Sequence, residues 1–466
     1  MQRSLFRFLA AVSLLALRAD AVERPRYGGT LRVEMQAAVR RLDPAEAPER
    51  LAGLVFERLV RLDERGRPQP ALALSWQSSP GGRRWQFRLR PGVKFHDGSP
   101  LTPAAAVAAL SAAGAAAPNA APNAPNGWTV TPLADGIMIR SEHPLPDLLS
   151  ELGAMRNAIM LHNADGTLSG TGPFRVAQWE ADRRAVFTAN EDYWDGRAFL
   201  DTIAIQMGRS PQQQMLDLEL GKADLVEIGP DEARRASQGG MKVWSSAPVT
   251  LVAIVFERGR AAAEDARVRG ALALSIDRAA IHSVLLQKQG EPAGGLLPQW
   301  LSGYAFLFRT ARDLARAREL AASIPPGAAP LTLGYDPADT LARSIAERVT
   351  VNAREAGMRP QVAPQTAKPD LRLVRVRIRS MDPAEALSGL AASLGLADLL
   401  TLAEPASPEA CYAAERALIE DFRVIPLVHL PEIYASRPAV RTWQTPGLLK
   451  TGGWRLEDIW LAPERP

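Results

Sequence analysis

The sequence is poor in residues that commonly do chemistry. It has one cysteine, Cys411, and five histidines among 466 residues, so an intramolecular disulfide is excluded. No HxH or HExxH pair, GxSxG elbow or Walker A loop is present, and these are the local signatures of zinc sites, serine hydrolases and nucleotide-binding loops. The sequence therefore predicts no catalytic residue, no metal site and no cofactor. Cys411 lies in a helix-like run and is interpreted as a small buried apolar residue, with a catalytic thiol as the alternative.

The chain also lacks a large excess of either positive or negative charge. Lysine and arginine number 55 against 51 aspartates and glutamates, a net charge of +4. The first 21 residues hold three arginines and one aspartate, so without them 52 basic residues face 50 acidic ones. This balance does not predict a nucleic-acid-binding protein. The 47% hydrophobic and 23% charged residues are typical of a globular chain, and the length fits two or three domains.

The most prominent apolar run lies near the N-terminus and is short. Residues 8–17 form a ten-residue apolar segment, which is too short to span a bilayer comfortably. Arg3 and Arg7 precede it, and Ala19-Asp20-Ala21 follows as a small-x-small cleavage site. The pattern predicts a secretory signal peptide over residues 1–21 and a mature chain that begins at Val22. An uncleaved membrane anchor is the alternative. No cysteine lies here to carry a lipid, which favours a soluble periplasmic protein over a lipoprotein.

Hydrophobic periodicity predicts an alternation of strands and helices. Strands are expected at residues 27–35, 223–227, 251–256, 331–335 and 424–430, and a hairpin at 76–95. Helices are expected at residues 51–62, 212–220, 267–286 with a break at Asp277, 312–322 and 341–356. Residues 251–256 are all apolar, so both faces of that strand should be buried. Glu46, Glu49 and Glu57 are predicted to lie on solvated helix faces. The β-α-β rhythm predicts a mixed α/β fold.

An ordered series of short motifs gives the most specific information in the chain. The motifs are VFERLV at 55–60, PALA at 70–73, WQFRLRPG at 85–92, GVKFHDGSPL at 92–101, GTGPF at 170–174, NEDYW at 190–194, VRGALALSIDR at 268–278 and VIPLVHL at 424–430. Together they resemble the family 5 extracellular solute-binding proteins, which are the oligopeptide, dipeptide and nickel receptors of bacterial ABC importers. The match covers most of residues 27–350 and resumes at about 416–440. It is thin at about 365–410, where the chain looks shorter than its relatives.

The resemblance implies a fold and a domain plan. The expected fold is the type II (cluster C) periplasmic-binding-protein fold, α/β, with two lobes, an extra domain and a discontinuous lobe I. The implied boundaries are 27–43 for the first part of lobe I, 44–171 for extra domain II, 172–258 for the second part of lobe I, 259–435 for lobe II (domain III) and 436–466 for the C-terminal return to lobe I.

The resemblance also implies a function without covalent chemistry. A periplasmic receptor of this kind captures a small solute by closure of its lobes and delivers it to the permease subunits of an ABC importer. A peptide is the default ligand, followed by nickel chelates and oligosaccharides, and the expected state is a monomer. Two alternatives stay open: a non-transport binding protein with a signalling or chaperone-like role, and, less favoured, a hydrolase.

The resemblance points to several candidate ligand-binding residues. Met35 and Gln36 follow the first strand and face the cleft in the family fold, as does the strand end at Glu227. Trp300 and Tyr304 fall where relatives carry an aromatic loop. Trp300 could equally be a core residue, and Glu227 a surface strand residue.

The segment from Arg375 to Asp382 bears most directly on whether the ligand is a cation or an anion. Peptide-binding relatives hold the ligand ammonium with an aspartate in this region, and Asp382 is the nearest candidate, although it aligns better with a later structural Asp-Pro. Arg375, Arg377 and Arg379 alternate and should share one side of a strand. If that side faces the cleft, the site prefers anions. If it faces solvent, the arginines carry no such meaning.

Overall fold

The computed structural model describes residues 24–63, 66–115, 127–163, 165–325, 331–403, 406–443 and 454–463. The predicted signal peptide at residues 1–21 lies outside this part of the chain. Across the described ranges, no helix combines the length and the apolar character needed to cross a membrane.

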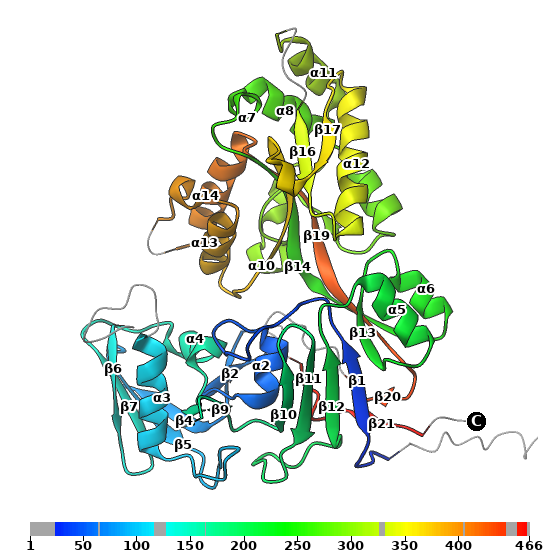
Figure 1. Cartoon of the computed structure of the whole chain (residues 1–466). Coiled ribbons are helices and arrows are strands. Elements are labelled where there is room, and N and C mark those ends of the chain that lie inside the picture. Colours follow the sequence, from blue (N-terminus) through cyan, green and yellow to red (C-terminus); the bar gives the residue numbers. More distant parts are fainter. Residues whose placement is uncertain are drawn as a thin grey trace, which may run out of the picture.

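One large mixed sheet runs through the molecule. Eleven strands belong to it, in the order β10 (Phe174–Glu180), β11 (Arg184–Ala189), β12 (Thr202–Gln206), β1 (Thr30–Glu34), β13 (Leu225–Ile228), β19 (Val424–Ser436), β14 (Lys242–Phe256), β18 (Leu371–Arg377), β16 (Thr332–Tyr335) and β17 (Gln361–Pro364), with β15 (Glu291–Pro292) paired to β19. In Figure 1 the β10 side belongs to the lower mass and the β16–β17 side to the upper mass. We call these masses the lower lobe and the upper lobe.

Strands β14 and β19 connect the two lobes (Figure 1). Their lower ends pair with each other at residues 242–245 and 433–436, and β13 joins β19 there. Their upper ends pair at residues 250–255 and 424–430, and β18 joins β14 there. The regular register breaks on both sides of Pro248, because proline has no N–H for a sheet ladder. The irregular stretch therefore lies where the strands pass from one lobe to the other.

The lower lobe contains the rest of the N-terminal half of the chain. A second, four-stranded sheet has the order β4 (Ala73–Ser78), β5 (Arg84–Leu89), β7 (Gly136–Ser141) and β6 (Trp128–Pro132). The helices are α2 (Glu49–Val55), α3 (Pro103–Ala115), α4 (Leu148–Leu152), the 3-10 turn η1 (Met155–Asn157), α5 (Pro211–Glu219) and α6 (Ala233–Gln238). Three two-stranded pairs complete it: β2 (Val60–Leu62) with β3 (Pro68–Pro70), β8 (Leu161–His162) with β9 (Leu168–Ser169), and β20 (Val440–Arg441) with β21 (Trp460–Leu461).

The upper lobe packs helices on both faces of the sheet. Side chains of β14 alternate between two cores, with Val252 and Ile254 in one and Leu251 and Ala253 in the other. The prediction that this strand is buried on both faces is confirmed. The elements are α7 (Ala261–Glu264), α8 (Ala266–Ser275), α9 (Arg278–Ala280), the π-turn η2 (Ile281–Leu285), α10 (Gln299–Ser302), η3 (Ala305–Leu307), α11 (Leu314–Ala322), α12 (Thr340–Glu355), η4 (Gln365–Ala367), α13 (Pro383–Ser393), η5 (Ala397–Leu399) and α14 (Pro408–Glu420).

The hydrophobic cores follow this division. One lower-lobe core surrounds β1, β11 and β12, and a second lies between α3 and the four-stranded sheet. Leu51 and Leu54 of α2 belong to the first of these cores, although the predicted boundaries assign residue 44 onward to the extra domain. Those boundaries stay a prediction. Cys411 is buried beside Tyr304 and Phe308, in agreement with its interpretation as a packing residue.

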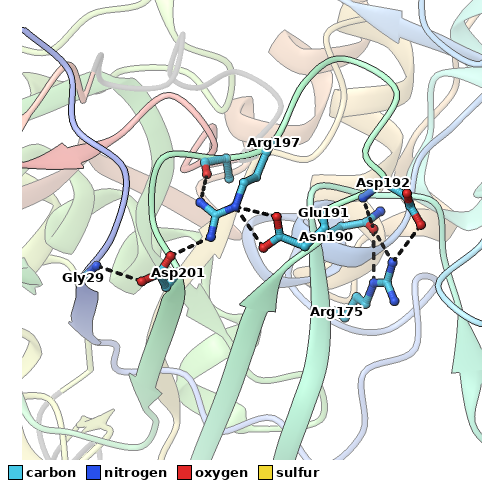
Figure 2. A network of polar contacts seen from close by, with 8 residues as sticks. Gly29, Arg175, Asn190, Glu191, Asp192, Arg197 and Asp201 are labelled. Carbon is cyan, nitrogen blue, oxygen red and sulfur yellow. Dashed lines mark hydrogen bonds and ion pairs between the residues drawn. The ribbon is translucent and has the colours of Figure 1, made fainter.

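A polar network anchors the start of β1 to the turn between β11 and β12 (Figure 2). Asp201 accepts a hydrogen bond from the Gly29 N–H at 3.3 Å and forms an ion pair with Arg197 at 2.6 Å. Arg197 also binds Glu191 at 2.8 Å, whereas the neighbouring Asp192 lies 4.0 Å from Arg175. The adjacent carboxylates Glu191 and Asp192 therefore contact different arginines, and these contacts hold the chain segments together.

One predicted helix is too long. The helix expected over residues 51–62 ends at Val55, and residues 60–62 form strand β2. The carbonyl oxygen of Val55 accepts a hydrogen bond from the Gly172 N–H at 2.9 Å, and the Glu57 carbonyl accepts one from Ile159 at 2.8 Å. These long-range backbone bonds end the helix, and local periodicity contains no sign of them.

Glu57 is not on a solvated helix face, so that prediction is wrong. Its carboxylate accepts hydrogen bonds from the Thr171 hydroxyl at 2.8 Å, the Tyr193 hydroxyl at 3.1 Å and the Trp194 indole at 2.9 Å. Burial raises the pKa of Glu57 from 4.5 to about 7, although the three donors act to lower it. The residues come from three of the motifs, and Glu57 fixes these segments to one another.

We expect Glu57→Gln to change how stability depends on pH. Between about pH 4.5 and 7 the folded protein holds the Glu57 proton, while the unfolded chain has released it. The contribution of this group to the free energy of unfolding is therefore lost as the pH rises through 7. Measured by urea unfolding, the variant should gain about 3 kcal/mol relative to wild type between pH 5 and pH 8. Glu142→Gln, at an exposed position, should show no such gain. A pH-independent difference for Glu57→Gln would contradict the assignment.

Candidate functional site

A cavity of about 570 Å³ lies between the two lobes, beside the strands that connect them. The lower lobe lines it with Gln36, Ala37, Arg50, Gly208, Arg209, Ser210, Pro211, Gln212, Glu227, Ile228, Gly229, Pro230, Asp231 and Glu232, and the upper lobe and β19 with Thr250, Asp336, Ala338, Asp339, Thr340, Leu341, Arg375, Pro431, Glu432, Ile433 and Tyr434. This size and position suit a small-molecule site.

A nearly buried ion pair organises the lower wall. Glu227 binds Arg50 at 2.8 Å, and the two side chains are only 11% and 13% exposed. The other carboxylate oxygen of Glu227 accepts a hydrogen bond from the Gln36 N–H at 2.7 Å. The backbone N–H of Glu227 donates to Gln214 at 2.8 Å. Strand β13, the end of β1, α2 and α5 are therefore tied together through one residue, Glu227, whose carboxylate binds Arg50 and Gln36 and whose backbone N–H binds Gln214.

Two further ion pairs lie on the upper side. Arg375 binds Asp339 at 2.7 Å, and Asp339 also caps α12 by accepting a hydrogen bond from Ala342. Arg377 binds Glu432 at 2.7 Å. Burial alone would raise the pKa of Glu432, but the Arg377 and Arg50 guanidinium groups lower it below 4.5. Glu432 is therefore ionised at neutral pH.

Two hydrogen bonds reach across the cavity rim from one lobe to the other. The Gln212 amide on α5 donates to the Thr340 hydroxyl on α12 at 3.2 Å. The Gln287 amide of the upper lobe donates to the Asp231 carbonyl of the lower lobe at 3.1 Å. Both involve exposed neutral groups, so water can replace them at little cost. Opening at the rim would therefore leave the hydrophobic cores intact.

The structure brings together two of the predicted site residues. Gln36 and Glu227 line the cavity and contact each other directly. Arg377 lies behind the cavity surface and contacts it through Glu432.

The other predicted site residues lie elsewhere. Met35 is fully buried in the lower-lobe core, because side chains alternate along the strand and place Gln36 on the other side. The Trp300 indole donates to the Pro248 carbonyl at 2.7 Å, next to the irregular stretch of β14. Tyr304 is buried, and its hydroxyl donates to Glu415 at 2.9 Å.

Arg379 and Asp382 are also absent from the cavity lining. Arg379 follows the end of β18 and is exposed. Asp382 caps α13 by accepting a hydrogen bond from the Glu385 N–H at 2.9 Å. This is the structural Asp-Pro role considered as an alternative above.

Sequence reasoning missed most of the polar lining, including Arg50, Asp231, Asp336 and Tyr434. A usable signal was present for part of it. β1 runs parallel to β13, and β16 runs parallel to β18. Polar residues just after the carboxyl ends of parallel strands gather at one sheet edge, and Asp231 and Asp336 stand in that position.

Within the described ranges, no three His, Cys, Asp or Glu side chains are grouped so that they could hold a metal ion.

We expect Arg50→Met to destabilise the protein strongly, because it leaves Glu227 nearly buried without its charge partner. The predicted loss is about 3 kcal/mol in urea unfolding, and adding Glu227→Gln should restore much of it. Arg235→Met removes an exposed ion pair with Glu219 and should cost less than about 1 kcal/mol. Equal losses for Arg50→Met and Arg235→Met would contradict this account.

Comparisons with known proteins identify the fold. The structure superimposes on nickel-binding NikA from Staphylococcus aureus, solved in complex with Ni(L-His)2, with a TM-score of 0.77 over 93% of this chain and all of that one, at 17% identity. It also superimposes on DppA from Helicobacter pylori, solved with the peptide STSA, with a TM-score of 0.76, 94% and 99% coverage and 20% identity. The predicted periplasmic-binding-protein fold is confirmed.

Sequence comparisons point to the same group of solute-binding proteins. The chain is 25% identical over 273 residues to "Di/tripeptide-binding protein 2" from Pseudomonas aeruginosa, covering 50% of this chain and 51% of that protein. It thus spans about half the length of such curated relatives. The model of the bacterial extracellular solute-binding proteins, family 5, matches residues 67–391. The resemblance seen in the motifs is confirmed, and the chain belongs to the family 5 bacterial extracellular solute-binding proteins.

Proposed function

We propose that this chain is the periplasmic substrate-binding component of an ABC importer. It captures a small solute by closure of its two lobes and delivers it to permease subunits in the membrane. The observation that carries the proposal is the cavity of about 570 Å³ lined by both lobes. Because both walls contribute contacts, a bound solute stabilises the closed form more than the open one, and this difference drives closure.

A peptide is the proposed solute. The relative from Pseudomonas aeruginosa is named as a di/tripeptide-binding protein, and the DppA structure holds a four-residue peptide. Thr250, Gln212 and Gln36 supply neutral polar groups to the lining, while Ile228, Leu341 and Tyr434 supply apolar surface. This mixture suits a short peptide, in which backbone amides alternate with side chains.

Binding rather than catalysis fits the chemistry of the cavity. Its arginines are tied in ion pairs, as Glu227–Arg50 and Asp339–Arg375 show. No serine, cysteine or threonine of the lining is hydrogen-bonded to a histidine. A nucleophile activated by a base, which a hydrolase of that type needs, is not among the described contacts. We propose further that the protein acts as a periplasmic monomer after removal of residues 1–21.

Filling the cavity tests the site. Ala338 is exposed and lines the upper wall, so Ala338→Trp should occupy solute space without disturbing a core. Protein unfolded in urea and refolded to release bound solute is titrated calorimetrically with a pool of di- to tetrapeptides. We expect the variant to bind at least about tenfold more weakly.

The matched control is Ala392→Trp on an exposed position of α13, which should bind as wild type does. X-ray scattering on the same samples should show a smaller radius of gyration when wild type is saturated. Unchanged binding by Ala338→Trp would place the solute elsewhere. No binding and no compaction of the wild type with any peptide would refute a peptide receptor.

A further inference from the structure

The charges of the cavity are not balanced. Three arginines line it, and each is bound to a carboxylate: Arg50 to Glu227 at 2.8 Å, Arg209 to Asp217 at 2.6 Å and Arg375 to Asp339 at 2.7 Å. Arg377 lies behind the surface and is bound to Glu432. Arg375 and Arg377 on β18 are therefore both neutralised by carboxylates.

Three lining carboxylates remain after these pairs are formed: Asp231, Glu232 and Asp336. Glu232 accepts a hydrogen bond from the Gly229 N–H at 3.1 Å, and Asp336 accepts one from the Ala338 N–H at 2.9 Å. A neutral N–H donor orients a carboxylate without neutralising it. Burial raises the pKa of Glu232 above its ordinary value, although the Gly229 N–H acts to lower it, whereas Asp231 and Asp336 are exposed. No ion pair with a lysine or arginine is found for any of the three within the described residues.

The three carboxylates belong to opposite walls. Asp231 and Glu232 follow β13 in the lower lobe, and Asp336 follows β16 in the upper lobe. The two rim hydrogen bonds start from the same segments, since one uses the Asp231 carbonyl and the other uses Thr340. Closure therefore brings like charges nearer to each other in a partly desolvated space, which opposes closure of the empty protein.

A positively charged solute reverses this effect. An ammonium or guanidinium group between the walls is attracted by both, and it gains more from the closed form than from the open one. An extended organic cation can pack its stem on Ile228, Leu341 and Tyr434.

We propose that the solute of this cavity carries a side-chain ammonium or guanidinium group, as a basic peptide does, and that this group is attracted by Asp231 and Glu232 on one wall and Asp336 on the other. This inference rests on the proposed function of the cavity as the solute site and names the charge class of the solute.

Three tripeptides that differ in one side chain test the proposal: Ala-Lys-Ala, Ala-Gln-Ala and Ala-Glu-Ala. Calorimetric titration of refolded wild type in 50 mM salt should give an affinity for Ala-Lys-Ala at least about tenfold higher than for Ala-Gln-Ala, and Ala-Glu-Ala should bind most weakly. Raising the salt to 500 mM should reduce this preference, because the interacting charges are partly exposed.

Two variants assign the preference to the named carboxylates. Asp336→Asn and Glu232→Gln should each reduce the lysine preference about threefold or more, while affinity for Ala-Gln-Ala changes little. Asp147→Asn, at an exposed position outside the cavity, should leave the preference intact. Thermal unfolding of each variant confirms that it is folded, and the second variant keeps the test valid if one is not.

The outcomes separate this inference from the proposed function. Equal affinities for the three tripeptides, a preference for Ala-Glu-Ala, or an unchanged lysine preference in both variants would overturn the charge assignment, while binding blocked by Ala338→Trp would still support the cavity as the solute site. If none of the tripeptides and no peptide of the pool binds, both proposals fail.

Discussion

The pairing of β14 with β19 is the constraint on which the rest of the structure depends. These two strands belong to both lobes, since β13 joins them below and β18 joins them above. The regular register is interrupted on both sides of Pro248 and again between Val252 and Ala253. Pro431, which pairs with Pro248, lines the cavity together with the residues that follow it to Tyr434. A ladder that is interrupted where the strands pass between the lobes permits bending there. The cavity and this irregular stretch are therefore parts of one feature.

The polar groups around this irregular stretch have two separate roles. Glu227–Arg50 and Glu432–Arg377 hold strand ends in place, and each pair is mostly shielded from water. Glu232 and Asp336 accept hydrogen bonds from backbone N–H groups of the turns that follow the strands, and both line the cavity together with Asp231. Paired charges fix the walls, and unpaired charges remain to interact with a solute. Whether a charged residue has an ion-pair partner therefore indicates its role better than the sign of its charge does.

Local patterns in the sequence predicted strands, caps and buried faces well. The all-apolar segment of β14 lies between two cores, and Asp277 caps α9 by accepting a hydrogen bond from Ala280 at 2.9 Å. Predictions failed where distant segments meet. The end of α2 is set by Gly172, and Glu57 is enclosed by residues from positions 171, 193 and 194. Of the eight predicted ligand-binding residues, Gln36 and Glu227 line the cavity, and the ligand-binding role of all eight stays a prediction.

The excess of negative charge on both walls also favours an open form of the empty protein. The two rim hydrogen bonds, from Gln212 and Gln287, are neutral and exposed, so each contributes about 1 kcal/mol or less to closure. Repulsion between carboxylates on opposite walls acts against them. A solute that places a positive charge between the walls offsets this repulsion and shifts the equilibrium toward the closed form.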